Sequence, residues 1–257
     1  MLFPFVNNCY YYIFYEQNTP TSSPTAMPTS SPVTAVPTNS DFLTQGLQFY
    51  YTFSSASVSG FEVADYRTGS PVFNAKLQNG ATVSNGQLLL SSSLSQFMSL
   101  SAFTTGNNGL SFACWFRSSN SNSEARIFDF GNGPNADNIK MEITNNNLEV
   151  NLYGGSSTLG YIPIPIPANN NQWHHVVWVI SKYKNLWTLY FDGVSVAQQS
   201  VAYPNAISRW INYIGKSNWN VDPYLNGAIR DFRMYNRNLS SVEASLLFTS
   251  TQVRKLN

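Results

Sequence analysis

The stretch NQWHHVVWVI, residues 171–180, decides the fold because it places the chain's only two histidines in an apolar run. Side chains along a strand alternate between its two faces. Both faces are apolar here, since Val177 lies on one and Trp178 on the other. This pattern is typical of a strand buried between two layers. The stretch therefore predicts a strand that is covered on both sides, with Trp173 among the interior side chains.

The two histidines do not predict a catalytic or metal site. His174 and His175 are neighbours in the sequence, so a strand directs their side chains to opposite faces. A zinc site needs three or four ligands, and the chain has no third histidine. The G-x-S-x-G turn of many hydrolases is also absent from the sequence. We interpret both histidines as hydrogen-bonded structural residues at the start of a strand.

The sequence pattern predicts β-strands both before and after this strand, from Asp41 onward. Residues 139–144 and 148–153 alternate apolar and polar side chains around an Asn-rich turn, which predicts a hairpin with one buried and one solvated face. Asp192-Gly193 predicts a second hairpin. One short helix is expected, because Ser240 and Glu243 have the spacing of a capping box. Together these patterns predict an all-β, two-sheet antiparallel sandwich or jelly roll.

The run YIPIPIPA, residues 161–168, alternates apolar residues with prolines. It could dock into a groove of another protein. Alternatively, it could form an edge connection in which the prolines prevent further strand pairing. The sequence favours the second interpretation.

The composition of the chain excludes several functions. Charged residues make up 11% and the net charge is +1, with no basic run, so the sequence does not predict nucleic-acid binding. The two cysteines give no disulfide framework, since Cys9 lies near the N-terminus and Cys114 lies in an apolar strand pattern. We expect Cys114 to be a small buried hydrophobic residue.

The chain divides into three regions. Residues 1–17 are an aromatic-rich tail, which is interrupted by Asn7 and Asn8 and is too short to span a membrane. Residues 18–42 are a Pro/Ser/Thr-rich linker that contains an eight-residue repeat, and residues 43–253 are the predicted jelly-roll domain. The tail lacks the positive charge of a secretory signal. The sequence predicts an extracellular or surface-displayed protein, or alternatively one on a virion surface, without a convincing signal peptide.

Five segments resemble the laminin-G-like, concanavalin A-like lectin/glucanase family, in family order over about residues 45–250. LSFACWFRSS, QWHHVVWVI and WTLYFDGVSV are similar to three of its strands. YLNGAIRDFRMYNRNLSSVEA is similar to its closing segment, and QFYYTFSS with Asp65 and Gly69 resembles its opening. The resemblance implies two packed antiparallel sheets of roughly six or seven strands each, one convex and one concave.

This fold carries both enzymes and binding modules. Laminarinase-type members place their catalytic acids in an E-x-D-x-E pattern, whereas no two of the thirteen acids here are separated by two positions. Glu142 and Glu149 could face one another across the Asn-rich hairpin, but such pairs are common on solvated faces. We therefore expect a protein that is not an enzyme.

A glycan-binding site combines an aromatic platform with amide and carboxylate groups. The segment SNWNVDPY predicts such a loop, with a ligand-binding set formed by Trp219, Asn218, Asn220, Asp222 and Tyr224. Alternatively, Trp219 folds back over the sheet edge. A second candidate is the polar face of the predicted hairpin together with Asp129: Lys140, Glu142, Glu149, Asn151 and Tyr153. Trp210 could be part of the core or exposed.

The resemblance also raises the question of calcium, which many family members bind through an early aspartate. Asp65 occupies that position, but Arg230 replaces the aspartate of the closing segment and Asp231 follows it. A guanidinium beside a divalent cation is unfavourable, so we expect no cofactor and regard calcium as doubtful.

Two functions remain open from the sequence. One is a non-catalytic module on a stalk that binds a glycan or glycoprotein. The other is a structural protein of a virion or cell-surface assembly, joined to a larger protein assembly through its N-terminal tail.

Overall fold

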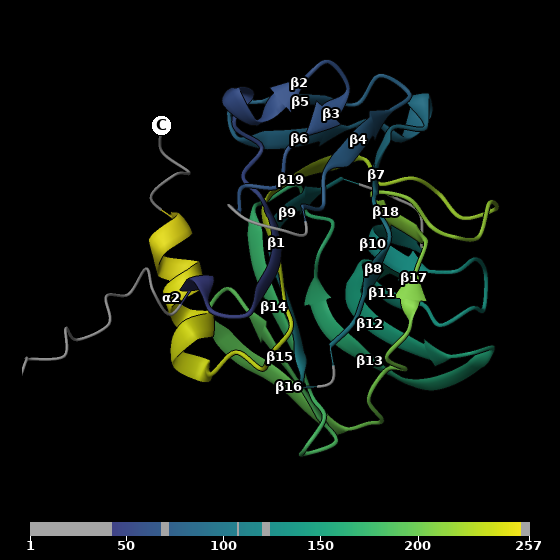
Figure 1. Ribbon diagram of the computed structural model, residues 1–257, viewed down its shortest axis with the longest axis vertical. Coiled ribbons are helices and arrows are strands. Elements are labelled where there is room, and N and C mark those ends of the chain that lie inside the picture. Colours follow the sequence, from purple (N-terminus) through teal and green to yellow (C-terminus); the bar gives the residue numbers. More distant parts are fainter. Residues whose placement is uncertain (1–42, 68–71, 107, 120–123, 253–257) are drawn as a thin grey trace, which may run out of the picture. The chain divides into compact units, whose positions relative to one another are not determined.

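The computed structural model describes residues 43–67, 72–106, 108–119 and 124–252. The predicted tail and linker lie outside these residues, so the expectations for them stay predictions. Within the described part, two large antiparallel sheets pack face to face (Figure 1). The prediction of an all-β, two-sheet jelly-roll sandwich is confirmed.

One sheet, here called the back sheet, has the strand order β16-β15-β14-β9-β19-β6-β5, and β1 pairs with β19. Its strands are β1 (Leu47–Tyr51), β5 (Thr82–Ser84), β6 (Gln87–Leu90), β9 (Leu110–Ser118), β14 (His174–Ser181), β15 (Leu186–Phe191), β16 (Val194–Ser200) and β19 (Gly227–Tyr235).

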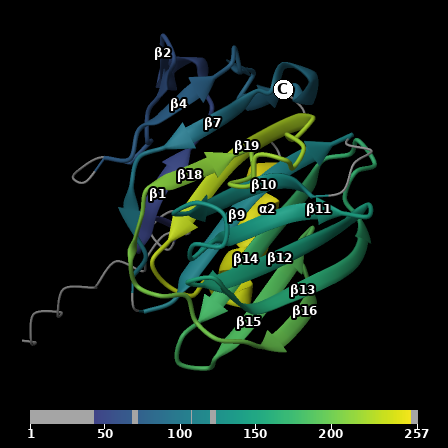
Figure 2. The same cartoon turned by 90° about the vertical axis from the view of Figure 1, so that its right-hand side faces the viewer.

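The second sheet, here called the front sheet, has the order β13-β12-β11-β10-β18-β7-β4-β3-β2 and faces the viewer in Figure 2. Its strands are β2 (Val58–Ser59), β3 (Glu62–Val63), β4 (Ala75–Gln78), β7 (Phe97–Leu100), β10 (Ala125–Gly131), β11 (Ile139–Thr144), β12 (Asn147–Gly154), β13 (Ser157–Pro167) and β18 (Ile211–Ile214). The proline-rich run forms β13, at the edge of this sheet, as the second interpretation predicts.

The remaining elements are short. β8 (Phe103–Thr104) pairs with β17 (Ser208–Arg209), and two 3-10 turns occupy Ser55–Ser57 and Ser92–Leu94. The helix α2 (Ser241–Gln252) follows the predicted capping box: the Glu243 amide donates to Ser240 Oγ at 3.2 Å, and the Ser240 amide donates to Glu243 Oε2 at 2.8 Å.

The β14 segment is buried on both faces, as its pattern predicts. Trp178 packs in the core between the sheets, 5.0 Å from Trp187. Val177 faces the other way and joins a second apolar cluster with Ala244 and Leu247 of α2. The helix therefore covers part of the outer face of the back sheet, and it lies behind the sandwich in Figure 2. Cys114 is buried in the core, and burial raises the pKa of its thiol.

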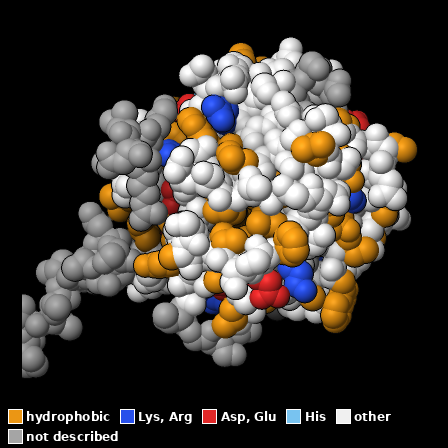
Figure 3. All heavy atoms as spheres, turned by 90° about the horizontal axis from the view of Figure 1, so that it is seen from above, with side chains coloured by type: hydrophobic (Ala, Val, Ile, Leu, Met, Phe, Trp, Pro, Cys, Tyr) orange, Lys and Arg blue, Asp and Glu red, His pale blue; other side chains and the backbone are white. Residues whose placement is uncertain are grey.

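The described surface is mostly uncharged. Figure 3 shows Lys, Arg, Asp and Glu side chains only as isolated spots on one face, which agrees with the 11% content of charged residues. Among the described helices, none has the length and apolar character needed to cross a bilayer.

Candidate functional site

The loop Ser217–Asp222, here called the Trp219 loop, follows β18 and reaches across the outer face of the front sheet. The Trp219 ring centroid lies 5.6 Å from that of Tyr153 on β12. The same ring has Lys140 Nζ of β11 at 5.3 Å and the Arg126 guanidinium of β10 at 5.7 Å. The two candidate sites predicted from the sequence, the Trp219 loop and the hairpin face, are thus one place in the fold.

The polar side chains of the hairpin are aligned in a row across neighbouring strands. Asp129 of β10 is paired with Lys140 of β11, which is paired with Asn151 of β12. These side chains are buried, and so is Glu142, whose exposed fraction is 2%. The prediction that this hairpin face is solvated is wrong, because the Trp219 loop packs against it.

Arg126 is the centre of this buried polar layer, with an exposed fraction of 2%. Its guanidinium forms ion pairs with Glu142 and, at 2.6 Å, with Asp222 Oδ2 of the Trp219 loop. It also donates to the Glu124 carbonyl at 2.5 Å. Asp222 additionally accepts a hydrogen bond from Ser217 Oγ at 2.7 Å. One arginine therefore links two strands of the sheet to the loop.

A second contact fixes the other part of the loop. The Asn218 amide donates to Asp129 Oδ2 at 2.9 Å, and Asn138 Nδ2 donates to Asp129 Oδ1 at 2.8 Å. Burial raises the pKa of Asp129, while these hydrogen bonds and the nearby Arg126 charge act in the opposite direction. Asn218 itself is buried, so its role here is to hold the loop in position.

Two pairs of carboxyl groups lie in or beside this layer, and one of their members, Glu124, is exposed. Glu142 and Glu149 are opposite one another on β11 and β12, and burial together with the Glu142 charge raises the pKa of Glu149. Burial and the Asp222 carboxylate likewise raise the pKa of Glu124. Glu142 is held by Arg126 and by Lys140 Nζ at 2.8 Å. A buried carboxylate fixed between two cations is not placed to reach a substrate.

The rim of the site contains aromatic side chains. Trp219 and Tyr153 are half-buried, and Tyr161, which is paired with Asn151, is exposed. On the other side of the loop, Tyr224 packs 6.0 Å from Phe97. Among the five residues predicted to bind a ligand, Trp219, Asn220 and Tyr224 reach the surface. The other two, Asn218 and Asp222, make the contacts that hold the loop.

The histidines lie away from this site, on the back sheet. His174 Nδ1 is 2.9 Å from Asp192 Oδ2. His175 is buried under α2, with its ring 5.1 Å from Trp115 and 5.9 Å from Phe248. Neither of its ring nitrogens has a hydrogen-bond partner among the described residues, so the prediction of a hydrogen-bonded histidine is wrong for His175. Within the described residues, no group of three or more His, Cys, Asp and Glu side chains could hold a metal ion.

The prediction that Trp173 belongs to the interior is wrong. It is half-buried and stacks on Arg230, whose guanidinium lies 4.9 Å from the Trp173 ring and 4.8 Å from the Trp115 ring. This cation–aromatic stack lies on the back sheet. It arises because Arg230 on β19 pairs with Trp115 on β9, a contact distant in sequence.

At the expected calcium position, the acidic side chains accept hydrogen bonds from donors within the protein. Asp65 Oδ2 accepts from Arg67 Nη2 at 2.9 Å, and Asp65 Oδ1 accepts from the Tyr50 amide at 3.0 Å. Asp231 accepts from the Tyr50 hydroxyl at 2.5 Å. A guanidinium therefore takes the place that a divalent cation would need at Asp65.

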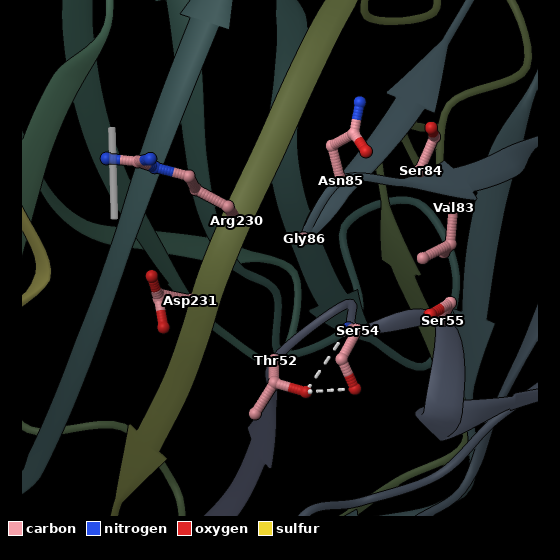
Figure 4. Close-up of a pocket in the computed structure, with 9 residues that line it drawn as sticks. All are labelled: Thr52, Ser54, Ser55, Val83, Ser84, Asn85, Gly86, Arg230 and Asp231. Atoms are coloured by element: carbon pink, nitrogen blue, oxygen red, sulfur yellow. Dashed lines mark hydrogen bonds between the residues drawn. The ribbon is translucent and has the colours of Figure 1, made fainter. Parts of the chain in front are cut away.

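A polar pocket of about 480 Å³ lies between the end of β1, the β5–β6 turn and β19 (Figure 4). Its lining includes Ser54, Asn85 and Arg230. In Figure 4 the side chain of Arg230 extends away from Ser84 and Asn85. The polar groups of this pocket do not converge on one point, and no aromatic ring lines its described part. Among the described residues, it lacks the aromatic platform that the Trp219 loop provides.

Arg126 was not among the residues predicted from the sequence to belong to the site. A signal was available, because Arg126 and Asp129 interrupt the otherwise apolar strand ARIFDFG. Charged side chains in a strand of this kind are buried only when they are paired. Such a pair indicates that another segment of the chain packs over the polar face of the strand.

A laminin G model described as the concanavalin A-like lectin/glucanases superfamily matches residues 91–245. A comparison with curated proteins found no match. The chain shares its fold with many solved structures at low sequence identity, of which three are described here. The binding domain of botulinum neurotoxin DC in complex with SialylT is 15% identical, with a TM-score of 0.57 over 80% of this chain and 51% of that one.

A structure of botulinum neurotoxin type C, whose cell entry is described as dependent on two ganglioside molecules, is 14% identical, with a TM-score of 0.56 over 80% of this chain and 51% of that one. The sialidase of Trypanosoma rangeli is 18% identical, with a TM-score of 0.59 over 82% of this chain and 34% of that one. The chain spans about half the length of the toxin structures that it matches.

Proposed function

Because the chain belongs to the concanavalin A-like lectin/glucanase superfamily, we propose that it is a non-catalytic carbohydrate-binding module whose binding face is the Trp219 loop. The observation that carries this proposal is the support beneath the Trp219 ring. Tyr153, Lys140 and Arg126 hold a half-buried indole in one orientation at the surface. A sugar presents an apolar C–H face, which stacks on such a preformed platform.

Polar groups surround the platform where the ring hydroxyls of a sugar need partners. Asn220 is exposed beside Trp219, and Glu149 and Tyr224 are half-buried at the rim. The surface of Tyr161 extends the aromatic face across the sheet. The toxin structures with which the chain shares its fold are described with a sialylated ligand or with gangliosides, which supports a glycan as the ligand class.

The absence of catalysis is part of the proposal. A retaining glycosidase needs two carboxyl groups about 5 Å apart, of which one attacks and the other donates a proton. Glu142 and Glu149 are the pair with suitable positions on neighbouring strands. Glu142 is buried and paired with Arg126 and Lys140, so only Glu149 can approach a ligand.

Replacing Trp219 by alanine is expected to weaken glycan binding by about 30-fold or more, the loss typical of a tryptophan at the centre of an interface. The measurement is a glycan array followed by titration of the best ligand. Phe61→Ala is the matched control, because Phe61 is an exposed aromatic residue in the turn before β3, at the opposite edge of the sheet. Binding that survives Trp219→Ala unchanged would place the ligand elsewhere.

Removal of divalent cations with a chelator is expected to leave glycan affinity within about twofold. The reason is that Asp65 is already held by Arg67 and by backbone amides, and this predicts that no cation organises the site. The titration is repeated in excess EDTA and after readdition of calcium. A tenfold loss that calcium restores would contradict this expectation.

A further inference from the structure

Trp210 differs from the other five tryptophans of the chain. Its exposed fraction is 69%, whereas Trp115, Trp178 and Trp187 are buried and Trp173 and Trp219 are half-buried. Ligand pockets are typically lined by aromatic side chains together with a few polar groups. Trp210 lies next to such a cavity, at the start of β18.

The backbone around Trp210 is firmly held. The Trp210 amide donates to Asn132 Oδ1 at 2.8 Å, and Asn132 Nδ2 donates to the Ser208 carbonyl at 3.0 Å. The preceding Arg209 is buried and donates to the Asp137 carbonyl at 2.9 Å and to Thr105 Oγ1 at 3.0 Å. The indole is therefore presented to solvent from a fixed backbone segment, and little backbone entropy is lost when a ligand binds.

The cavity beside the indole has a volume of about 380 Å³, within the usual range for small-molecule sites. Its apolar wall contains Phe73 and Phe103, which pack against Phe49 in the core at 6.0 Å and 5.4 Å. Its polar lining contains Gln48, Thr104 and Ser208. The Thr104 and Ser208 hydroxyls lie 2.8 Å apart in one hydrogen bond, and each retains capacity for another partner.

Charge distinguishes this cavity from the Trp219 loop. The described residues that line it are all uncharged: Gln48, Phe73, Ala102, Phe103, Thr104, Ser208 and Trp210. The Trp219 loop, by contrast, contacts a layer that contains the cations of Arg126 and Lys140 and the carboxylates of Asp129, Glu142 and Asp222. A charged group would lose its hydration in the Trp210 cavity without gaining a charged partner. Its lining suits a ring with an apolar face and neutral hydroxyl groups.

We propose that the Trp210 cavity is a second sugar subsite, which takes a neutral pyranose ring stacked on the indole. The subsite rests on the proposed carbohydrate-binding function but not on the Trp219 loop. Residues 211–218 lie between the two tryptophans, and β18 makes up the first four of them, a length of about 13 Å at the usual rise per strand residue. Ser208 and Thr104 bind the ring hydroxyls, and the side-chain NH2 of Gln48, whose Oε1 accepts from Asn236 Nδ2, donates to a hydroxyl or to an N-acetyl carbonyl.

The test uses the full chain and follows the six indole N–H signals by NMR during titration with methyl glycosides of glucose, galactose, mannose and N-acetylglucosamine. The Trp210 signal, assigned with Trp210→Phe, is expected to shift saturably with at least one of these probes. Trp210→Ala is expected to raise the dissociation constant of that probe about tenfold. Tyr183→Ala removes an aromatic side chain with an exposed fraction of 81% outside the cavity and is expected to leave it unchanged.

The outcomes separate this inference from the proposed function. A Trp210 signal that never shifts, with glycan binding lost in Trp219→Ala, overturns the second subsite and leaves the Trp219 loop as the site. A Trp210 signal that still shifts in Trp219→Ala supports the subsite. This conclusion holds even if Trp219→Ala keeps all of its array binding, a result that excludes the Trp219 loop as the glycan site. If Trp210→Ala binds the probe as tightly as the wild type, the subsite is wrong. If neither signal responds and the array is silent, both proposals are wrong.

Discussion

Replacing Arg126 by methionine is expected to lower the free energy of unfolding by about 3–5 kcal/mol. The substitution leaves Glu142 buried with Lys140 as its one cationic partner, and it removes the ion pair that joins Asp222 to the sheet. The Trp219 loop should then detach, so glycan binding falls together with stability. Chemical denaturation measures the first effect, and a glycan titration well below the unfolding midpoint measures the second.

Two further variants test whether the loss of stability in Arg126→Met comes from buried carboxylates that have lost their cationic partner. Adding Glu142→Gln and Asp222→Asn to Arg126→Met should recover part of the lost stability, because neutral amides are less costly to bury than unpaired carboxylates. Lys76→Met is the matched control, since Lys76 pairs with Glu62 at 3.9 Å on the exposed part of the same sheet. Its effect should stay within about 1 kcal/mol. A comparable cost for both single variants would contradict the central role of Arg126.

Acidification is expected to destabilise the protein through His175. Its exposed fraction is 1%, and neither ring nitrogen has a hydrogen-bond partner among the described residues. Burial, followed by the charge of Arg233, lowers the pKa of His175 from 6.5 to about 3, with Arg230 adding to the effect and Asp192 opposing it. Between pH 6.5 and about 3, His175 is therefore protonated in the unfolded chain but neutral in the folded protein.

The direction in which stability changes with pH follows from this difference in proton binding. The stability contributed by neutral His175 is complete above pH 6.5 and is lost progressively as the pH falls toward 3. The loss from this group reaches about 2 kcal/mol at pH 5, at 1.36 kcal/mol per pH unit. Urea unfolding between pH 7.5 and pH 4.5 measures it.

The variant His175→Phe isolates this contribution, because a phenyl ring keeps the contacts with Trp115 and Phe248 but cannot be protonated. The difference in stability between the two proteins should grow in favour of the variant as the pH falls. Carboxyl groups with raised pKa values, including Glu149, titrate in both proteins and cancel in the difference. A difference that does not change with pH would show that His175 is protonated without cost in the folded state.

The sequence predicted the fold well because the decisive patterns are local. Alternation in β11 and β12, the Asp192-Gly193 turn and the capping box at Ser240 each depend on residues that are close in the chain. The double-faced apolar pattern of β14 likewise indicated a strand with a layer on each side, and the core together with α2 supplies these layers.

The candidate site was predicted only in part, because burial of a polar face depends on distant segments. The hairpin residues have the pattern of a solvated face, and their cover comes from Asp222, which lies 96 positions beyond Arg126 in the chain. The same limit applies to Trp173, whose stacking partner Arg230 comes from a late strand. The exposure of Trp210 depends on the hydrogen bonds that Asn132 and Arg209 make around it. The alternation of apolar residues in the sequence does not indicate these hydrogen bonds.

The short strand β18 has a consequence for selectivity by ligand length. Hydrogen bonds to β10 on one side and β7 on the other fix β18 in place, so the proposed subsites at Trp210, just before it, and at Trp219, beyond residues 215–218, have a fixed separation. A single sugar unit can engage one end only and exchanges rapidly. An oligomer long enough to touch both ends binds the second at high effective concentration, and its residence time rises without any new contact. Chain length would then count for more than the identity of each sugar.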